Sequence, residues 1–265
     1  MSTRHSDLPR AVRFLGVRMF PWTMQQTLQE ISRRLEAGRF TQHVVVNVAK
    51  IVNMRKDVGL REAVHGCDII NIDGMGVVWG ARLLGIQVPE RVAGVDLFFA
   101  LLELASRRGE AVFFLGAREE VVEAAVRNIR GRYPGLNIAG WHHGYFWGDE
   151  EVVVRRIAAS GATMLFVAIS SPKKEQFIYQ WRDRLGVRFA MGVGGTFDIV
   201  AGVTRRAPEW MQKTGMEWFY RVLQEPRRMW KRYLLTNSRF AWLLTREMTR
   251  AAVNRYRLLL NRESN

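Results

Sequence analysis

Short runs rich in β-branched residues alternate with longer segments of helical periodicity between about residue 11 and residue 200, and this alternation limits the possible folds more than any other feature. Strand, helix and strand in succession are typical of a parallel sheet with crossover helices on its faces. The pattern predicts an α/β, Rossmann-like, mostly parallel sheet. Strands are expected at residues 12–17, 43–47, 69–72, 112–115, 138–141, 164–169 and 188–193, and helices near 23–37, 74–85, 95–108, 118–131, 149–159 and 172–184.

The strand signal stops after Gly202, and two helical segments are predicted at about residues 208–235 and 238–260. Residues 202–265 hold 14 Lys or Arg and five Glu, and so carry nine of the chain's net charge of +15. Trp and Leu alternate with Arg there, which suits either a helical hairpin docked on the sheet or a helix on an anionic membrane surface. We therefore predict a catalytic core at residues 1–201 and a basic helical appendage at residues 202–265.

The overall composition narrows the classes of protein. With 265 residues and 48% hydrophobic side chains, the chain can bury one sizeable core, so a disordered or fibrous protein is excluded. A single cysteine, Cys67, cannot form a disulfide framework, and the chain opens on polar residues, so a cytoplasmic location is expected. Charged residues interrupt every long apolar run, which argues against a membrane span. The positive charge indicates a polyanionic partner: nucleic acid, a phosphorylated ligand or anionic lipid.

Polar and glycine residues follow several predicted strands at their carboxyl ends, where open parallel sheets bind ligands. Asp73 directly follows a strand and precedes Gly74. Its carboxylate would serve either as a general base that takes a proton from an attacking hydroxyl or as the N-cap of the next helix. The other candidates for ligand binding at these strand ends are Asn47, Gly74, Gly116, Ser170, Ser171, Lys174, Gly194, Gly195 and Asp198.

Two of these segments suit a phosphate. Ser170 and Ser171 precede Pro172, a residue suited to the first turn of a helix, although many helices begin this way without a ligand. The glycines at residues 192–195 permit close approach of the backbone to a ligand. A dinucleotide Gly-x-Gly-x-x-Gly pattern after the first strand and a Walker loop are both missing from the sequence, which argues against a Rossmann oxidoreductase.

Metal-ligand patterns are also missing from the sequence. His142 and His143 are adjacent, and nothing near them supplies further ligands, so a loop or packing role is expected. There is no Asp-x-Asp to hold a divalent ion on a diphosphate, so Arg, Lys and backbone donors would have to neutralise such a ligand. Arg221, Arg228 and Lys231 would share one helical face if Pro226 only kinks its helix.

One residue and five segments together resemble the WecG/TagA/CpsF glycosyltransferases, known as glycosyltransferase family 26. They are Asn47, the segment from Ile72 to Trp79, Pro89 to Leu97, Ser171 to Glu175, and Gly192 to Pro208 with Glu217 to Arg232. The resemblance runs in order from about residue 14 to residue 240. It implies an inverting, metal-independent transfer of a sugar from a UDP-sugar to a sugar on a polyprenyl diphosphate, with a Rossmann-like core, no cofactor and a basic appendage at the cytoplasmic membrane face.

The resemblance also implies roles for single residues. Asp73 matches the proposed catalytic base, Arg91 the arginine thought to steady the donor or leaving diphosphate, and Asn47 a pocket asparagine. Arg221, Arg228 and Lys231 match cations proposed to reach the acceptor's diphosphate. Lys174 stands where many members have Gln, and Val45 stands where some have Thr. These departures leave the donor open between an N-acetylmannosamine type and a glucose type, and the Ser-Ser-Pro-Lys-Lys-Glu segment looks closest to exopolysaccharide members.

Two other interpretations of the function stay open. A nucleic-acid-binding protein would explain the charge, with aromatic residues stacking on bases, although the resemblance implies no nucleic-acid partner. A non-catalytic scaffold would follow if Asp73 only caps a helix. Whether copies of the chain form a homo-oligomer is also open.

Overall fold

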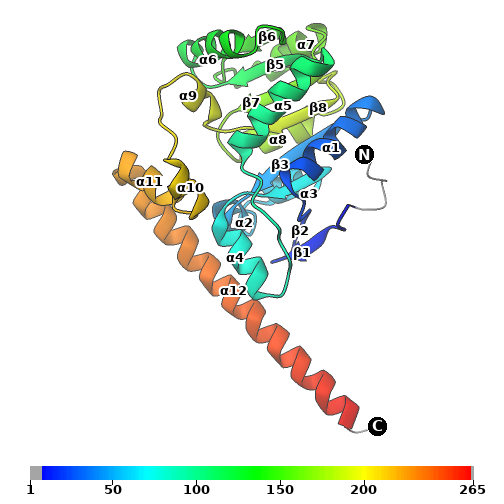
Figure 1. Cartoon of the computed structure of the whole chain (residues 1–265), viewed down its shortest axis with the longest axis vertical. Helices are drawn as coiled ribbons and strands as arrows, with labels where there is room; N and C mark the ends of the chain where they lie inside the picture. Colours follow the sequence, from blue (N-terminus) through cyan, green and yellow to red (C-terminus); the bar gives the residue numbers. More distant parts are fainter. Residues whose placement is uncertain (1–7, 264–265) are drawn as a thin grey trace.

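The computed structural model describes residues 8–263, with side chains except at residue 228 and residues 254–263. Six parallel strands form the central sheet in the order β4-β3-β8-β7-β5-β6 (Figure 1). The predicted α/β fold with a mostly parallel sheet is therefore confirmed. The strands are β3 (Thr41–Val46), β4 (Ile69–Ile72), β5 (Ala111–Gly116), β6 (Asn137–His142), β7 (Met164–Ala168) and β8 (Phe189–Gly192).

Helices cover both faces of this sheet. Successive strand residues point to opposite faces, so Phe114 packs with one set of helices and Phe113 with another. The Phe114 face is covered by α1 (Met24–Glu36), α5 (Gly94–Arg108) and α6 (Glu119–Arg132). The other face is covered by α7 (Glu150–Ala159) and α8 (Lys173–Trp181), and near β3 and β4 by α2 (Val48–Asn53), α3 (Val58–His65) and α4 (Met75–Leu83).

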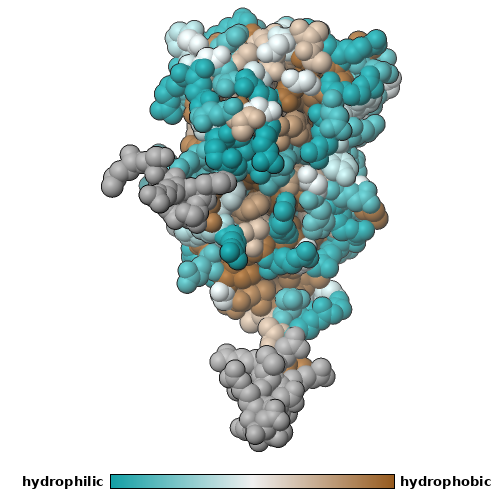
Figure 2. All heavy atoms as spheres, turned by 90° about the vertical axis from the view of Figure 1, so that its right-hand side faces the viewer, coloured by the Kyte–Doolittle hydropathy of each residue, from teal (hydrophilic) through white to brown (hydrophobic). Residues whose placement is uncertain are grey.

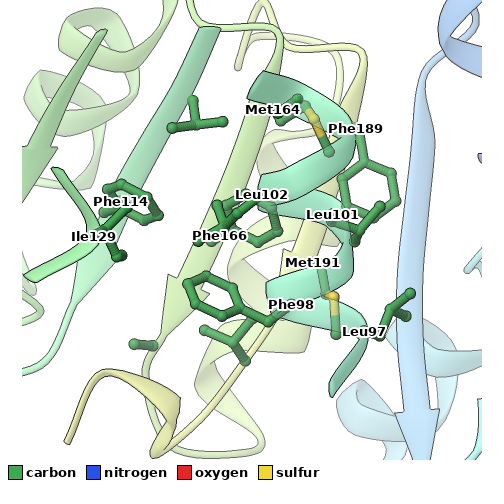
Figure 3. Packing of buried hydrophobic residues seen from close by; sticks show 14 of the residues in the cluster. Leu97, Phe98, Leu101, Leu102, Phe114, Ile129, Met164, Phe166, Phe189 and Met191 are labelled. Atoms are coloured by element: carbon green, nitrogen blue, oxygen red, sulfur yellow. The ribbon is translucent and has the colours of Figure 1, made fainter. Parts of the chain in front are cut away.

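Helix α5 supplies the centre of the largest buried cluster. Its residues Leu97, Phe98 and Leu101 are fully buried and point onto the sheet (Figure 3). The ring of Phe98 meets that of Phe166 edge-on, with 5.0 Å between the centroids. Burying a side chain of this size contributes about 1.5–3 kcal/mol, so this contact fixes α5 firmly. The start of α5, at Gly94, is thereby held at the carboxyl edge of the sheet.

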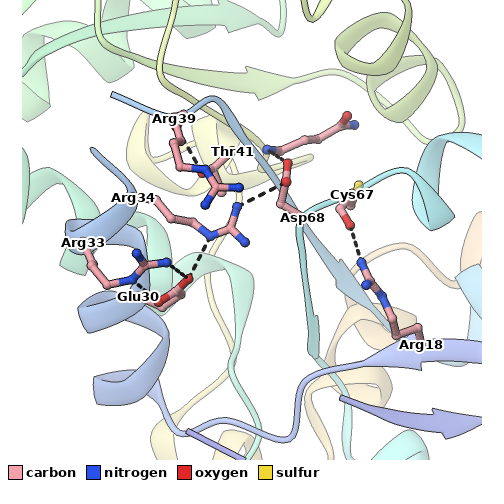
Figure 4. A network of polar contacts seen from close by, with 9 residues as sticks. Arg18, Glu30, Arg33, Arg34, Arg39, Thr41, Cys67 and Asp68 are labelled. Atoms are coloured by element: carbon pink, nitrogen blue, oxygen red, sulfur yellow. Dashed lines mark hydrogen bonds and ion pairs between the residues drawn. The ribbon is translucent and has the colours of Figure 1, made fainter. Parts of the chain in front are cut away.

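A polar network ties α1 to the opposite, amino edge of the sheet (Figure 4). The Arg34 guanidinium contacts Glu30 at 2.9 Å and Asp68 at 3.2 Å. The carboxylate of Asp68 also accepts the backbone N–H of Gln42 at the start of β3, at 2.9 Å. The amino edge is therefore occupied by structural ion pairs.

The first predicted strand is wrong in its extent and its place. Residues 12–17 do not form a strand of the parallel sheet but most of an antiparallel hairpin of β1 (Val12–Phe14) and β2 (Val17–Met19). The chain turns at Leu15 and Gly16, whose φ angles are 47° and 81°. Glycine adopts such a positive φ without strain, and this turn signal interrupts the apolar run.

The two predicted C-terminal helices are also corrected. Gly202 is followed by α10 (Glu209–Lys213), α11 (Glu217–Gln224) and one long helix, α12 (Pro226–Glu263). Pro226 starts α12 because a proline ring cannot continue the preceding helix. The expected break near residue 237 does not occur: the Thr236 and Ser238 hydroxyls donate to carbonyls one turn earlier, at 2.8 Å each, and the helix continues.

Helix α12 runs diagonally across the molecule and extends beyond the core (Figure 1). It docks through Phe240, which is 7% exposed and whose ring centroid lies 6.2 Å from that of Phe14. Other large apolar side chains of α12 are exposed, among them Trp230, Leu234 and Trp242. Apolar surface also appears just above the grey C-terminal residues (Figure 2). No helix within residues 8–263 is long and apolar enough to cross a membrane.

Candidate active site

Asp73 lies one residue beyond β4, at the carboxyl edge of the sheet, and is half-buried. Its backbone N–H donates to the Val46 carbonyl at 2.8 Å. The N-cap position of α4 is Gly74, with a φ of 108° and no side chain to bond, so Asp73 is not the helix cap. The carboxylate instead accepts a hydrogen bond from the backbone N–H of Gly94, at the start of α5. A helix N-terminus is a favourable place for a negative charge.

Burial raises the pKa of the Asp73 carboxyl above its ordinary value, and the nearby Glu217 carboxylate adds to this rise. Arg91, Arg221 and the hydrogen bond from Gly94 act in the opposite direction but do not outweigh burial. The carboxylate is thus more basic than an ordinary aspartate. This is the direction that suits a general base, which must accept a proton near neutral pH.

Arg91 and Arg221, predicted from different parts of the chain, meet on one carboxylate. Arg91 Nη1 donates to Glu217 Oε2 at 3.1 Å, and Arg221 Nη2 donates to Glu217 Oε1 at 3.4 Å. Arg91 and Glu217 are 13% and 15% exposed, while Arg221 is 48% exposed. Sequence reasoning missed Glu217. Its spacing of four from Arg221 on a helix could have suggested their pair, but nothing local points to Arg91.

Arg206 and Asp96 form a bidentate ion pair beside this group, with Nη2 donating to Oδ2 at 2.8 Å. Asp96 lies in the first turn of α5. Arg206 has its pKa raised chiefly by the hydrogen bonds to Asp96, with weaker help from Glu217 and Asp73. Sequence reasoning missed this pair as well, because its members are 110 residues apart.

Two hollows flank these charges. One, of about 320 Å³, is lined by Gly195, Asp198, Arg206, Glu217 and Arg221 among others, so two predicted donor-binding residues face a predicted acceptor-binding cation. The other, of about 540 Å³, is lined by Met75, Arg91, Asp96, Arg206, Glu209, Gln212 and Lys213. Arg206 lines both hollows. Space for ligands is thus present on both sides of the cation cluster.

The remaining predicted donor-binding residues lie along the same edge. Asn47 caps α2: its Oδ1 accepts the Lys50 N–H at 3.0 Å, and a Cβ on Gly74 would lie 3.5 Å from the Asn47 Cβ. Ser170 and Ser171 are exposed just before α8. Packing requires a glycine at position 116, since a Cβ there would lie 2.4 Å from the Ala168 carbonyl oxygen. Gly194 has a φ of 57°, which favours glycine.

Lys174 is buried, not open to the cleft. Its ammonium lies 3.1 Å from Glu175 Oε1, which also pairs with Lys50 at 2.7 Å. Burial lowers the pKa of Lys174 to about 8, and Glu175 only partly offsets this. The stem of Lys174 passes over Gly192, where a Cβ would lie 2.7 Å from its Cδ. Gly192 is therefore required by this lysine, and direct contact of Lys174 with a donor stays a prediction.

We expect Glu175→Gln to lower the free energy of unfolding by roughly 3–5 kcal/mol, because two buried ammonium groups would lose the carboxylate that they share. Burial opposes ionisation of Glu175, but Lys50 and Lys174 lower its pKa to about 2. Its ion pairs therefore stabilise the fold above the ordinary pKa of 4.5, and this stability is lost as the pH falls toward 2. Urea unfolding measures the change. The exposed Glu151–Arg184 pair supplies the control, Glu151→Gln, and an equal loss in both variants would contradict the prediction.

The appendage cations do not share one helical face. Arg221 belongs to α11 and Lys231 to α12, because Pro226 starts a new helix instead of kinking one. Lys231 is exposed. The side chain of Arg228 lies outside the described residues.

The adjacent histidines do not point to a metal site: the His142 ring nitrogen Nδ1 bonds to the neighbouring His143 carbonyl at 2.8 Å. Among the described residues, no three His, Cys, Asp or Glu side chains are grouped so that they could hold a metal ion.

Comparison with known proteins adds an independent line of evidence. The model of the glycosyl transferase WecG/TagA/CpsF family matches residues 12–254. An N-acetylglucosaminyldiphosphoundecaprenol N-acetyl-beta-D-mannosaminyltransferase of Bacillus subtilis (strain 168) is 37% identical over 179 residues, which are 68% of this chain and 69% of that protein. A protein of the same name from Bacillus spizizenii is 40% identical over 167 residues, covering 63% of this chain and 64% of the relative.

Proposed function

Since the chain belongs to the WecG/TagA/CpsF glycosyltransferase family, we propose that it transfers a sugar from a UDP-sugar to a sugar carried on a polyprenyl diphosphate. The observation that supports this most is the half-buried Asp73, with its raised pKa, beside Arg91 and Arg221. A base and two guanidinium groups at one strand end are the parts that such a transfer needs. The product would serve the synthesis of a bacterial surface polysaccharide or exopolysaccharide.

The proposed reaction is a single displacement. Asp73 accepts the proton of an acceptor hydroxyl while the hydroxyl oxygen attacks the anomeric carbon of the donor. The bond from that carbon to the diphosphate oxygen breaks, UDP leaves with the electron pair, and the anomeric configuration inverts. As the pH falls through the pKa of Asp73, the protonated acid can no longer accept a proton, so turnover falls on the acid side.

The arginines compensate the charge of the two diphosphates in this proposal. Arg91 faces the leaving UDP, on which negative charge develops, and a donor placed there lowers the barrier. Arg221, Arg228 and Lys231 are assigned to the acceptor's diphosphate. Guanidinium groups bind phosphates by bidentate hydrogen bonds, which suits a site that works without a metal ion. Activity in the presence of a chelator is the expected outcome.

The protein is proposed to work at the inner face of the plasma membrane. The described part of α12 exposes Trp230, Leu234 and Trp242 at spacings of four and eight residues, which place them on one side of the helix. The Arg246 guanidinium lies over the Trp242 ring, 5.5 Å from its centroid. Trp at headgroup depth and Arg beside lipid phosphate are typical of peripheral helices. Because the polyprenyl chain of the proposed acceptor lies in the membrane, this location would bring the site to its substrate.

Donor identity is the finer part of the proposal, and it is open between the N-acetylmannosamine type and the glucose type. The two relatives are named as N-acetylmannosaminyltransferases, which favours the N-acetylmannosamine type, whereas Lys174 favours the glucose type. We expect product when purified protein is offered UDP-N-acetylmannosamine or UDP-glucose with a short polyprenyl-diphosphate N-acetylglucosamine. Mass and linkage analysis identify the transferred sugar. No product from any UDP-sugar, together with salt-sensitive binding to generic DNA, would favour a nucleic-acid-binding protein instead.

A further inference from the structure

Glu217 joins two cations that belong to different parts of the molecule. Each oxygen of its carboxylate accepts one guanidinium, Arg91 at 3.1 Å and Arg221 at 3.4 Å. Arg91 lies in the segment between α4 and α5, and Arg221 lies one turn after Glu217 on α11. Glu217 is the first residue of α11, where the helix dipole stabilises its charge. With 15% of its side chain exposed, the carboxylate is held between the core and the appendage.

Helix α11 makes further contacts besides those of Glu217. The Trp218 ring packs 5.7 Å from that of Tyr233 on α12, and Gln224 Nε2 donates to the Arg205 carbonyl at 3.0 Å. The Arg206–Asp96 pair ties the preceding segment to α5. These contacts tie α11 to α12 and to the segment at residues 205–206, which the Arg206–Asp96 pair joins to α5. What the carboxylate adds is the placement of the two guanidinium groups relative to each other and to Asp73.

We propose that Glu217 is a positioning residue for sugar transfer: it holds Arg91 and Arg221 on the two oxygens of one carboxylate, and so sets where the donor and acceptor diphosphates lie around Asp73. This inference rests on the proposed function, in which Arg91 faces the donor and Arg221 the acceptor. In a displacement reaction, two substrates held in register react as if at very high concentration. A carboxylate that fixes both cations therefore supports the rate without touching the reacting atoms.

The charge of Glu217 also acts on the base. The groups that face Asp73 are Arg91 from the segment before α5, Glu217 and Arg221 from α11, and the Gly94 N–H; Arg206 and Tyr233 interact with it more weakly. Among these, Glu217 is the group whose negative charge raises the pKa of Asp73. Its removal should lower that pKa, and the acid side of the activity profile should move to lower pH. A role in docking alone would not move it.

The test compares Glu217→Gln and Glu217→Asp with the parent protein and with Glu103→Gln. Glu103 is 59% exposed and pairs with Arg107 at 3.4 Å on α5, so the control removes the same charge from a similar pair. Glu217→Gln should lower kcat/KM about 10- to 100-fold, as expected when a hydrogen bond between charged groups is lost. Its acid limb should move to lower pH, and Glu217→Asp should recover part of the activity. Glu103→Gln should match the parent.

The outcomes separate this inference from the function on which it rests. A parent protein that transfers no sugar counts against the proposed function, and this role falls with it. An active parent with an equally active Glu217→Gln overturns the role of Glu217 alone. So does a loss of activity with an unmoved acid limb and no recovery in Glu217→Asp, because that result describes a docking contact. Far-ultraviolet circular dichroism and thermal unfolding check that each variant is folded.

Discussion

Asp73→Asn should reduce the turnover number by roughly 10²-fold or more, the usual contribution of a general base. The affinity for UDP should stay close to that of the parent protein. The amide keeps the shape of the side chain, and its oxygen can still accept the hydrogen bond from the Gly94 N–H. What the variant loses is the ability to take a proton from the acceptor hydroxyl. Arg91 remains in place to bind the leaving diphosphate.

Steady-state transfer assays and calorimetric titration of UDP measure the two halves of this prediction. The matched control is Asp183→Asn at an exposed position beyond the end of α8, which should leave both quantities unchanged. Turnover of Asp73→Asn close to that of the parent would show that another group accepts the proton. Loss of UDP binding together with turnover would show that Asp73 acts mainly in holding the donor.

A chain that ends at residue 201 should lose transfer to the polyprenyl-linked acceptor completely. This removes Arg221 and Lys231 together with the exposed Trp and Leu residues of α12. Truncation also uncovers Phe14, against which Phe240 packs, and burying a Phe contributes about 1.5–3 kcal/mol. A finer variant is therefore needed to separate chemistry from folding.

The double substitution Arg221→Gln with Lys231→Gln keeps the packing of α12 and should lower transfer at least tenfold, since each lost charged contact is worth roughly a factor of ten. The matched control is Arg107→Gln, an exposed arginine on α5. Binding to vesicles that contain anionic lipid, followed at rising salt, reports the membrane role independently. Full activity of the truncated chain on the lipid-linked acceptor would contradict both roles.

Most of the sheet was predictable because parallel strands buried on both faces are continuous apolar runs. The runs at β5 and β7 are buried along their whole length, and turn residues bound them. The hairpin at residues 12–19 was not predicted, because its two strands are only three residues each and look like one continuous apolar run across Leu15 and Gly16. The short helices α2 and α3 went unpredicted because neither is long enough to show a clear helical period.

The candidate site was likewise only partly predictable from the sequence. Asp73 was found from its place after an apolar strand, but two local interpretations stayed open in the sequence, a helix cap, which is the more common, and a general base. The structure excludes the cap, because Gly74 occupies the cap position and the carboxylate turns toward the start of α5; the role as general base stays a prediction. Lys174 was expected at the ligand; its ammonium pairs with the buried Glu175 carboxylate, which Lys50 shares, and its contact with a donor stays a prediction.

Local pattern alone is thus enough to place the six strands of the parallel sheet, the strand-end residues and the helical character of the basic C-terminal segment, because side-chain periodicity and turn chemistry depend on neighbours in the chain. The strand order β4-β3-β8-β7-β5-β6 and the pairing of Arg91 with Glu217, 126 residues apart, depend on how helices pack across the sheet. Contacts between such distant segments come from the burial of surfaces that are assembled only in the folded chain, so no short stretch of residues encodes them.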